Sequence, residues 1–167
     1  HDFTIGINDD ITFKSLVVDP DFKIDSSKEF LIYGYGSDGM VSASKSIMKL
    51  VGDNSDSFVQ GYFQYDSKKS GGVTISHLRF NDDVIRSTYY CENPSLVVVT
   101  KESYLNDFDC ISNIKENGDF ILNTIKSVDE LNKSLPNDFK RVIKSRNIKF
   151  YIINAYLLAS RLGLGNK

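Results

Sequence analysis

Short apolar runs alternate along this chain with segments whose apolar residues recur every three or four positions. The runs are rich in β-branched and aromatic residues, a composition typical of strands buried on both faces of a sheet. They predict strands at FLIYGYG (30–36), SFVQGYFQY (57–65), SLVVVT (95–100), DFILNT (119–124) and IKFYIIN (148–154), of which the first, the third and the last are expected to be buried.

Between these strands the apolar positions follow the period of an amphipathic helix. A left-handed glycine typically closes a helix, whereas proline or a Ser-x-x-Glu box opens one. The predicted helices are 40–51 before Gly52, 104–114 before Gly118, one opened by the box Ser127–Glu130, one opened by Pro136, and 155–162 before Gly163.

Two further runs, VTISHLRF (73–80) and VIRSTYY (84–90), are separated by Asn81, Asp82 and Asp83. Polar turn residues between two strand-like runs predict a hairpin. Strands that alternate with helices indicate an α/β fold, and the hairpin makes its sheet mixed. We therefore expect a three-layer α/β/α domain with a mostly parallel, mixed sheet.

Residues 1–27 lack this alternation. They are rich in Asp and Ser, include Pro20 and show no sustained period, so we interpret them as an extended linker arm. The α/β domain is then expected at 28–167, and the length of 167 residues suits one domain.

Charge and cysteine content narrow the function classes. A net charge of −2 gives no general reason to expect nucleic acid binding. No apolar run is long enough for a membrane span, and the N-terminus lacks the layout of a secretory signal. The two cysteines, Cys91 and Cys110, lack metal or redox spacing and are too few for an iron–sulfur cluster. We expect buried free thiols in a cytoplasmic protein.

The segment GYGSDG (34–39) matches Gly-x-Gly-x-x-Gly between a predicted strand and a predicted helix. Glycines let a ligand approach the backbone, and the first N–H groups of a helix favour an anion. Ser37 and Asp38 are candidate N-caps, although the charge of Asp38 repels phosphate and better suits a hydroxyl or an amine. The alternative is that the glycines only permit close contact between strand and helix.

An NAD site would also need an acidic residue just after the second strand. Asp53 and Asp56 come before that strand and Asp66 lies somewhat far along, which disfavours NAD and favours another phosphate-bearing ligand.

The segment YDSKKSGGV (65–73) follows the second strand. Lys68 and Lys69 offer charges for phosphates, and we expect this turn at the same sheet edge as the glycine turn. A solvated lysine turn is the alternative. His77 falls within a strand pattern without a partner signal, so we interpret it as a structural histidine.

These two turns resemble the gamma-type domain of pyruvate:ferredoxin (flavodoxin) oxidoreductases. The similar segments cover essentially the whole chain: the arm HDFTIGINDDIT, then GYGSDGMVSASKSIMKLVGDN, QGYFQYDSKKSGGVTISHLRF and IRSTYY, and the end INAYLLASRLGLGNK. The specific feature is the combination of DSKKSGGVT with GSDG. The gamma subunits of 2-oxoacid oxidoreductases have the same layout in looser form.

The resemblance implies one domain of a large, usually dimeric enzyme that oxidatively decarboxylates pyruvate. Such enzymes use thiamine diphosphate with Mg²⁺ and 4Fe-4S clusters, transfer the acetyl group to coenzyme A, and reduce ferredoxin, flavodoxin or a fused NADP⁺ reductase. This chain has no cysteine quartet and no Gly-Asp-Gly…Asn thiamine pattern, so we expect no catalysis, and no catalytic or metal-binding residue, in the domain alone.

The resemblance also implies that the domain closes over coenzyme A. Matching the family's motifs gives the candidate contacts Ser37, Asp38, Gly39, Ser67, Lys68, Lys69, Ser70 and Asn166. Two alternatives stay open: a purely structural docking domain whose loops contact sister domains, and an independent nucleotide-binding domain.

Overall fold

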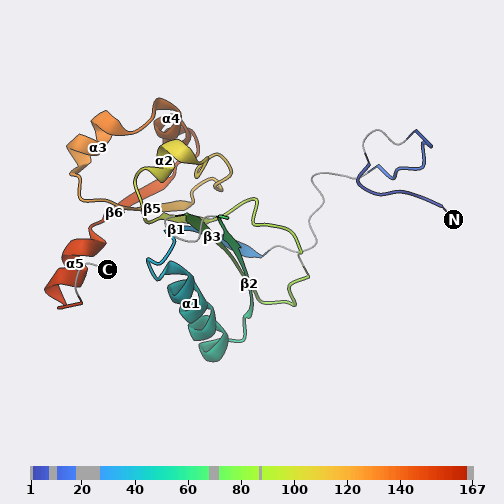
Figure 1. Cartoon of the computed structure of the whole chain (residues 1–167), viewed down its shortest axis with the longest axis horizontal. Coiled ribbons are helices and arrows are strands. Elements are labelled where there is room, and N and C mark those ends of the chain that lie inside the picture. Colours follow the sequence, from blue (N-terminus) through green and yellow to red (C-terminus); the bar gives the residue numbers. More distant parts are fainter. Residues whose placement is uncertain (1, 8–10, 18–26, 68–71, 87, 165–167) are drawn as a thin grey trace.

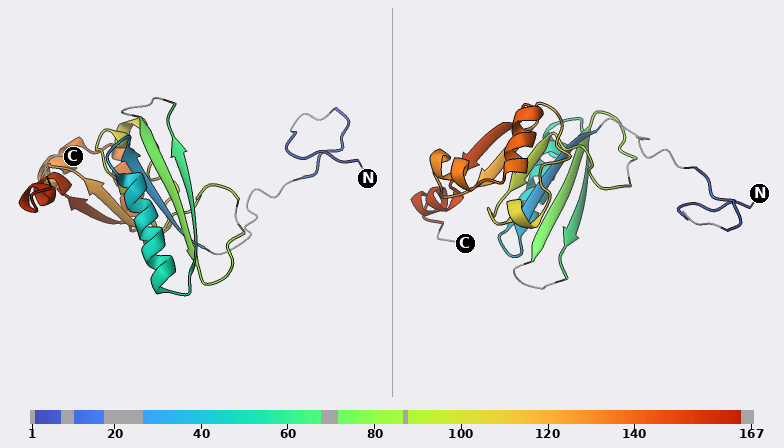
Figure 2. Two further views of the ribbon diagram at one scale, coloured as in Figure 1. Left: turned by 60° about the horizontal axis from the view of Figure 1, so that its bottom comes forward. Right: turned by 90° about the horizontal axis from the view of Figure 1, so that it is seen from above.

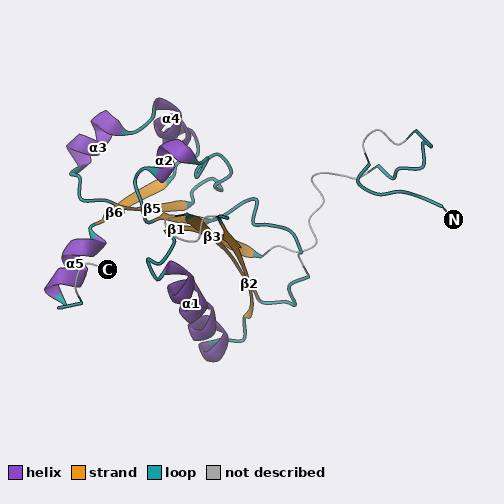
Figure 3. Ribbon diagram, in the orientation of Figure 1, coloured by secondary structure: helices purple, strands orange, loops and turns teal. Residues whose placement is uncertain are grey.

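A computed structural model describes residues 2–7, 11–17, 27–67, 72–86 and 88–164. Six strands form one sheet in the order β2-β3-β1-β4-β5-β6 (Figures 1 and 3). β1, β4, β5 and β6 run parallel, while β3 is antiparallel to both of its neighbours. The strands are β1 Lys28–Tyr35, β2 Phe58–Tyr65, β3 Val73–Asn81, β4 Leu96–Val99, β5 Asp119–Asn123 and β6 Lys149–Ile153. The expected mixed α/β fold is confirmed.

The helices lie on both faces of this sheet. α1 (Met40–Asn54) covers β1 to β3 on one face, and α2 (Tyr104–Asp107), α3 (Val128–Ser134) and α4 (Asn137–Ser145) lie on the other (Figures 1 and 2). α5 (Ala155–Arg161) follows β6 and shares a hollow with α1. Helices therefore cover both faces at the centre of the sheet. On the face that carries α1, a hollow lies over β4 to β6 between α1 and α5.

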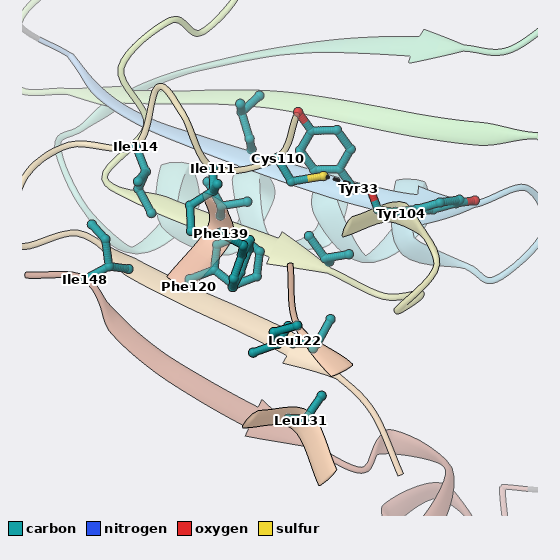
Figure 4. Close-up of a cluster of buried hydrophobic side chains, with 14 of the residues drawn as sticks. Tyr33, Tyr104, Cys110, Ile111, Ile114, Phe120, Leu122, Leu131, Phe139 and Ile148 are labelled. Atoms are coloured by element: carbon teal, nitrogen blue, oxygen red, sulfur yellow. Dashed lines mark hydrogen bonds between the residues drawn. The ribbon is translucent and has the colours of Figure 1, made fainter. Parts of the chain in front are cut away.

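The larger core lies between the sheet and α2 to α4. Figure 4 shows Phe120 and Leu122 of β5 meeting Phe139 of α4 and Leu131 of α3. The rings of Phe120 and Phe139 meet edge to face, with centroids 5.1 Å apart. A smaller core under α1 contains Ile32, Leu78 and Phe80.

Both thiols are free and buried, as expected. Burial raises the pKa of Cys91 and of Cys110 to about 12. Because the thiolate is the reactive form, neither thiol is a nucleophile at neutral pH.

Local signals placed most helix ends correctly. Ser127 and Glu130 form the predicted capping box: the Glu130 amide donates to Ser127 Oγ, and the Ser127 amide donates to the Glu130 carboxylate. Gly163 is left-handed (φ 70°) just after α5. The prediction that α1 ends before Gly52 is wrong, because the helix continues through Gly52 to Asn54.

The helix predicted at 104–114 is only the four-residue α2. Phe108 is extended, and Asp109 Oδ1 accepts hydrogen bonds from the amides of Ile111 and Ser112, which form a tight turn instead. Ile111 and Ile114 are nevertheless buried in the larger core. The apolar spacing therefore reported burial correctly and was wrong about helix.

The hairpin predicted at 73–90 is also wrong. β3 pairs with β2 and β1, and the described residues of 82–95 contain no strand. Polar side chains of the sheet hold this loop instead. Glu29 Oε2 accepts from the amides of Glu92 and Asn93, and an Arg79 guanidinium nitrogen donates to the Tyr90 carbonyl at 2.8 Å.

A buried ion pair supports that loop. Arg79 donates to Glu29 Oε1 at 3.2 Å and to Gln60 Oε1 at 3.1 Å. The side chains of Arg79 and Glu29 are 3% and 11% exposed, so the loop anchor is shielded from water. Because each group has several partners, the desolvation of both charges is offset.

His77 has the structural role that the sequence predicts. Its Nδ1 accepts from the Cys91 amide at 3.2 Å, and its Nε2 lies 3.4 Å from Gln64 Oε1. Since Nδ1 accepts, the ring is neutral with the proton on Nε2. Burial, with the nearby positive charge of Arg79, lowers the pKa of His77 to about 4.

The margins of the domain depart from simple expectation. β6 is an edge strand among the described residues rather than a buried one, since Tyr151, Ile152 and Ile153 are all exposed. Within residues 2–7 and 11–17, Thr4 and Ser15 form a parallel bridge. The division of the chain at residue 27 stays a prediction. Among the described helices none is long and apolar enough to cross a bilayer.

We expect acid to destabilise the fold through His77. Its pKa is about 4 when folded and 6.5 when unfolded, so the unfolded chain binds the extra proton between these values. The free energy of unfolding should therefore fall as pH is lowered from 6.5 towards 4. Urea unfolding of the chain and of His77→Gln tests this, and the variant should show a smaller fall. Equal falls in both would contradict the assignment.

We expect Arg79→Met to lower the free energy of unfolding by about 3–5 kcal/mol, because it leaves the buried Glu29 carboxylate without its cation. Arg141→Met is the matched control: Arg141 pairs with Asp138 on the surface, where ion pairs contribute about 1 kcal/mol or less. Urea unfolding measures both. A loss at Arg79 no larger than that at Arg141 would show that the buried pair does not anchor the loop.

Candidate functional site

The site lies where the chain connections diverge, between β1 and β4. These strands are parallel neighbours, and the connection after β1 forms α1 on one face while the connection after β4 forms α2 on the other. Open α/β sheets bind ligands at such switch points, outside the carboxyl ends of the strands. The predicted glycine turn at 34–39 lies at this edge.

Asp38 organises the edge through its carboxylate. Oδ2 accepts from the Tyr35 amide at 2.7 Å and from Thr100 Oγ1 at 3.0 Å, and Oδ1 accepts from the Met40 amide at 2.8 Å. One side chain thus joins the ends of β1 and β4 to the start of α1. The three donors disperse the negative charge that a phosphate would otherwise meet.

The glycine turn is built from two left-handed residues. Ser37 has φ 75° and Gly39, the N-cap of α1, has φ 83°. Neither Ser37 nor Asp38 is therefore the N-cap, although the Asp38 carboxylate binds the first helical amide. A Cβ added at Gly39 would meet no atom within 4 Å, and the residue is exposed, so its backbone is accessible.

Gly34 serves close contact rather than access. A Cβ at this position would lie 2.7 Å from Thr74 Oγ1 and 2.9 Å from Met40 Cβ, both too near. The interpretation that the glycines allow strand and helix to approach therefore holds for Gly34, while Gly39 leaves its backbone open.

The second turn meets the first at the same edge. It is the hairpin connection from β2 to β3, and β3 pairs with β1 so that Tyr35 faces Val73. The Gly36 amide donates to the Gly72 carbonyl at 2.8 Å, which joins the two turns directly. Ser67 is exposed at the start of this turn. The other candidates, Lys68, Lys69, Ser70 and Asn166, lie outside the described residues.

An open hollow of about 530 Å³ extends from this edge over β4 to β6. Its floor is apolar and includes Val98, Ile121 and Ile153, and α1 and α5 stand at its sides. Its rim is polar and carries Asp38, Thr100, Lys101, Asn123 and Tyr156. We call this polar margin, together with the two turns, the rim.

Sequence reasoning missed the rim residues that come from β4, β5 and α5. Asn123 donates to the Thr100 carbonyl at 3.0 Å and accepts from the Ala155 amide at 3.0 Å, so it ties the ends of β4 and β5 to α5. Lys101 follows directly after Thr100. Their position in the sequence could have identified them, because they follow the carboxyl ends of predicted parallel strands.

The strand order argues against a dinucleotide site. In that fold the strand after the glycine turn and helix pairs in parallel beside the first strand. Here the antiparallel β3 separates β2 from β1, so the end of β2 lies about 10 Å from β1. Among the described residues no three His, Cys, Asp or Glu side chains gather as a metal site would need.

Comparison with known sequences identifies the family. The sequence model for "Pyruvate ferredoxin/flavodoxin oxidoreductase" matches residues 29–167. The chain is 46% identical over 99% of its length to a pyruvate-flavodoxin oxidoreductase of Enterobacter agglomerans, and 45% identical over all of it to a pyruvate dehydrogenase [NADP(+)] of Cryptosporidium parvum. It spans only 14% and 9% of those two relatives.

Solved structures share the fold. The pyruvate oxidoreductase subunit PORC of Thermotoga maritima has a TM-score of 0.64 at 21% identity, over 85% of this chain and 70% of that subunit. The gamma subunit of a keto/oxoacid ferredoxin oxidoreductase of Geobacter sulfurreducens has a TM-score of 0.56 at 14% identity, over 83% of this chain and 68% of its own. This chain belongs to the pyruvate ferredoxin/flavodoxin oxidoreductase family and has the fold of its gamma-type subunits.

Proposed function

We propose that this chain is the gamma-type domain of an enzyme that oxidatively decarboxylates pyruvate to acetyl-CoA. The support is its identity of 46% and 45%, over almost its whole length, to two pyruvate oxidoreductases. Because it spans 14% and 9% of them, most of the catalytic machinery lies in other domains of such enzymes.

The reaction centres belong to those other domains. Thiamine diphosphate with Mg²⁺ would supply the carbanion chemistry, and 4Fe-4S clusters the electron transfer. The residues of this chain do not fit a cluster, because its two thiols are buried and protonated. On this proposal the isolated domain is inactive and works in a cytoplasmic homodimer, with ferredoxin, flavodoxin or a fused NADP⁺ reductase as acceptor.

The contribution of this domain is to help bind coenzyme A at the rim. The observation that carries this proposal is the Gly36–Gly72 hydrogen bond, which brings the bases of the two turns together at the switch point. Coenzyme A carries a pyrophosphate and a 3′-phosphate, which suit open backbone amides and lysine ammonium groups. The proposed contacts are Ser37, Asp38, Gly39, Ser67, Lys68, Lys69, Ser70 and Asn166.

A solved relative is compatible with this role. The 2-oxoglutarate:ferredoxin oxidoreductase of Magnetococcus marinus was determined with 2-oxoglutarate, coenzyme A and succinyl-CoA bound, and its fold matches 83% of this chain at a TM-score of 0.59 and 14% identity. The competing function is that of a docking domain whose rim contacts sister domains, and the measurement below separates the two.

In the complete enzyme we expect Lys69→Ala to raise the KM for coenzyme A by about 10- to 100-fold, because a lysine–phosphate contact is a charge-assisted hydrogen bond. The double variant with Lys68→Ala should also lose any preference for coenzyme A over dephospho-coenzyme A. Lys115→Ala is the control, since Lys115 is exposed and its backbone amide donates to the Pro94 carbonyl at the opposite, amino end of β4. An unchanged KM for coenzyme A in both lysine variants would contradict the proposed coenzyme A contacts and favour the docking role.

A further inference from the structure

The segment that follows β4 faces the glycine turn across the switch point. Thr100 donates to Asp38 from this segment, and Lys101 lines the hollow beside it. The motifs that support the coenzyme A proposal do not include this segment.

Lys101 presents a cation at the rim. Its Nζ lies 4.7 Å from the centre of the Tyr35 ring and 5.7 Å from that of Tyr104. Among the described residues no carboxylate forms an ion pair with it, whereas Lys126, at the end of β5, pairs with Glu102. Aromatic rings hold an ammonium group in place without neutralising it. Lys101 is thus a positioned charge that is available to an anion.

Tyr104 supplies a hydroxyl without a partner. The residue is 5% exposed, and its hydroxyl makes no hydrogen bond among the described residues. Figure 4 shows Tyr104 at the margin of the larger core, with its hydroxyl directed away from Phe120 and Phe139. A buried hydroxyl left unpaired is destabilising, so such groups normally have a partner.

The surroundings of that hydroxyl point to the rim. Burial raises the pKa of Tyr104, and the charges of Asp38, Tyr35, Asp107 and Asp66 raise it further. The hydroxyl therefore stays protonated and donates. Lys101 Nζ lies 5.7 Å from the centre of the Tyr104 ring, so this ring neighbours a side chain that lines the hollow.

We propose that Lys101 and Tyr104 bind a phosphate group of the ligand that occupies the rim. This inference rests on the proposed coenzyme A role and extends it to the segment after β4. Lys101 contributes a positive charge, and Tyr104 contributes a neutral donor. Because the Tyr104 oxygen is covered in the free domain, its contact forms as the rim adjusts around the phosphate.

The complete enzyme provides the test, with steady-state kinetics in coenzyme A. Lys101→Met keeps the aliphatic stem over the rings and removes the charge, and Tyr104→Phe removes only the hydroxyl. Each should raise the KM for coenzyme A about tenfold or more with little change in kcat, as expected for a lost hydrogen bond to a charged group. Lys101→Arg should restore much of the affinity. Lys149→Met, at the amino end of β6, should leave KM unchanged.

Thermal unfolding separates binding from structure. Tyr104→Phe removes an unpaired buried hydroxyl, so the ligand-free enzyme should melt at the same temperature or higher while KM rises. A lower melting temperature with an unchanged KM would assign the hydroxyl a structural role and overturn the proposal for Tyr104.

Ligand analogues identify the group that is bound. A KM increase in Lys101→Met that disappears with dephospho-coenzyme A assigns the 3′-phosphate, and one that persists assigns the pyrophosphate. An equal increase with pantetheine, which has no phosphate, would overturn the proposal. If Lys69→Ala raises KM and neither Lys101→Met nor Tyr104→Phe does, this inference fails and the coenzyme A role stands. If none of the three variants raises KM, both fail.

Discussion

The site depends on the carboxylate of Asp38. Its two oxygens bind the Tyr35 amide, the Met40 amide and the Thr100 hydroxyl, and so hold β1, α1 and β4 together where the chain connections diverge. The three donors satisfy both oxygens of this half-buried carboxylate and fix its position at the turn. A negatively charged aspartate is unexpected in a turn that resembles a phosphate-binding turn. Here its role is to link the strands and the helix that form the turn.

The antiparallel hairpin of β2 and β3 gives this domain its second turn at the rim. Because β3 inserts between β1 and β2, the connection of this hairpin emerges beside the glycine turn, and the Gly36 amide reaches the Gly72 carbonyl. A simple parallel order would have placed a helix crossover there instead. One strand reversal therefore separates this fold from a dinucleotide-binding domain that starts from the same glycine pattern.

On the face of the β2–β3 hairpin that points away from α1, a loop takes the place of a helix. The loop that follows β3 lies over it, and Glu29, His77 and Arg79 bind the backbone of that loop. These polar side chains on strands β1 and β3 satisfy amides and a carbonyl that a strand ladder would otherwise pair. The buried charges are tolerated because each has a partner of opposite sign and several hydrogen bonds.

The sequence alone determined the local features: the strand runs, the Ser127–Glu130 box and Gly163 at a helix end, since these depend on neighbours a few residues away. It also indicated the two turns for which we propose phosphate binding. Only the tertiary structure decided that β6 is an edge strand among the described residues, that the described residues of 82–95 contain no strand, and that Lys101 lines the hollow at the rim. Those outcomes depend on contacts between residues far apart in the chain, and apolar spacing reports that a side chain is buried without reporting what it is buried against.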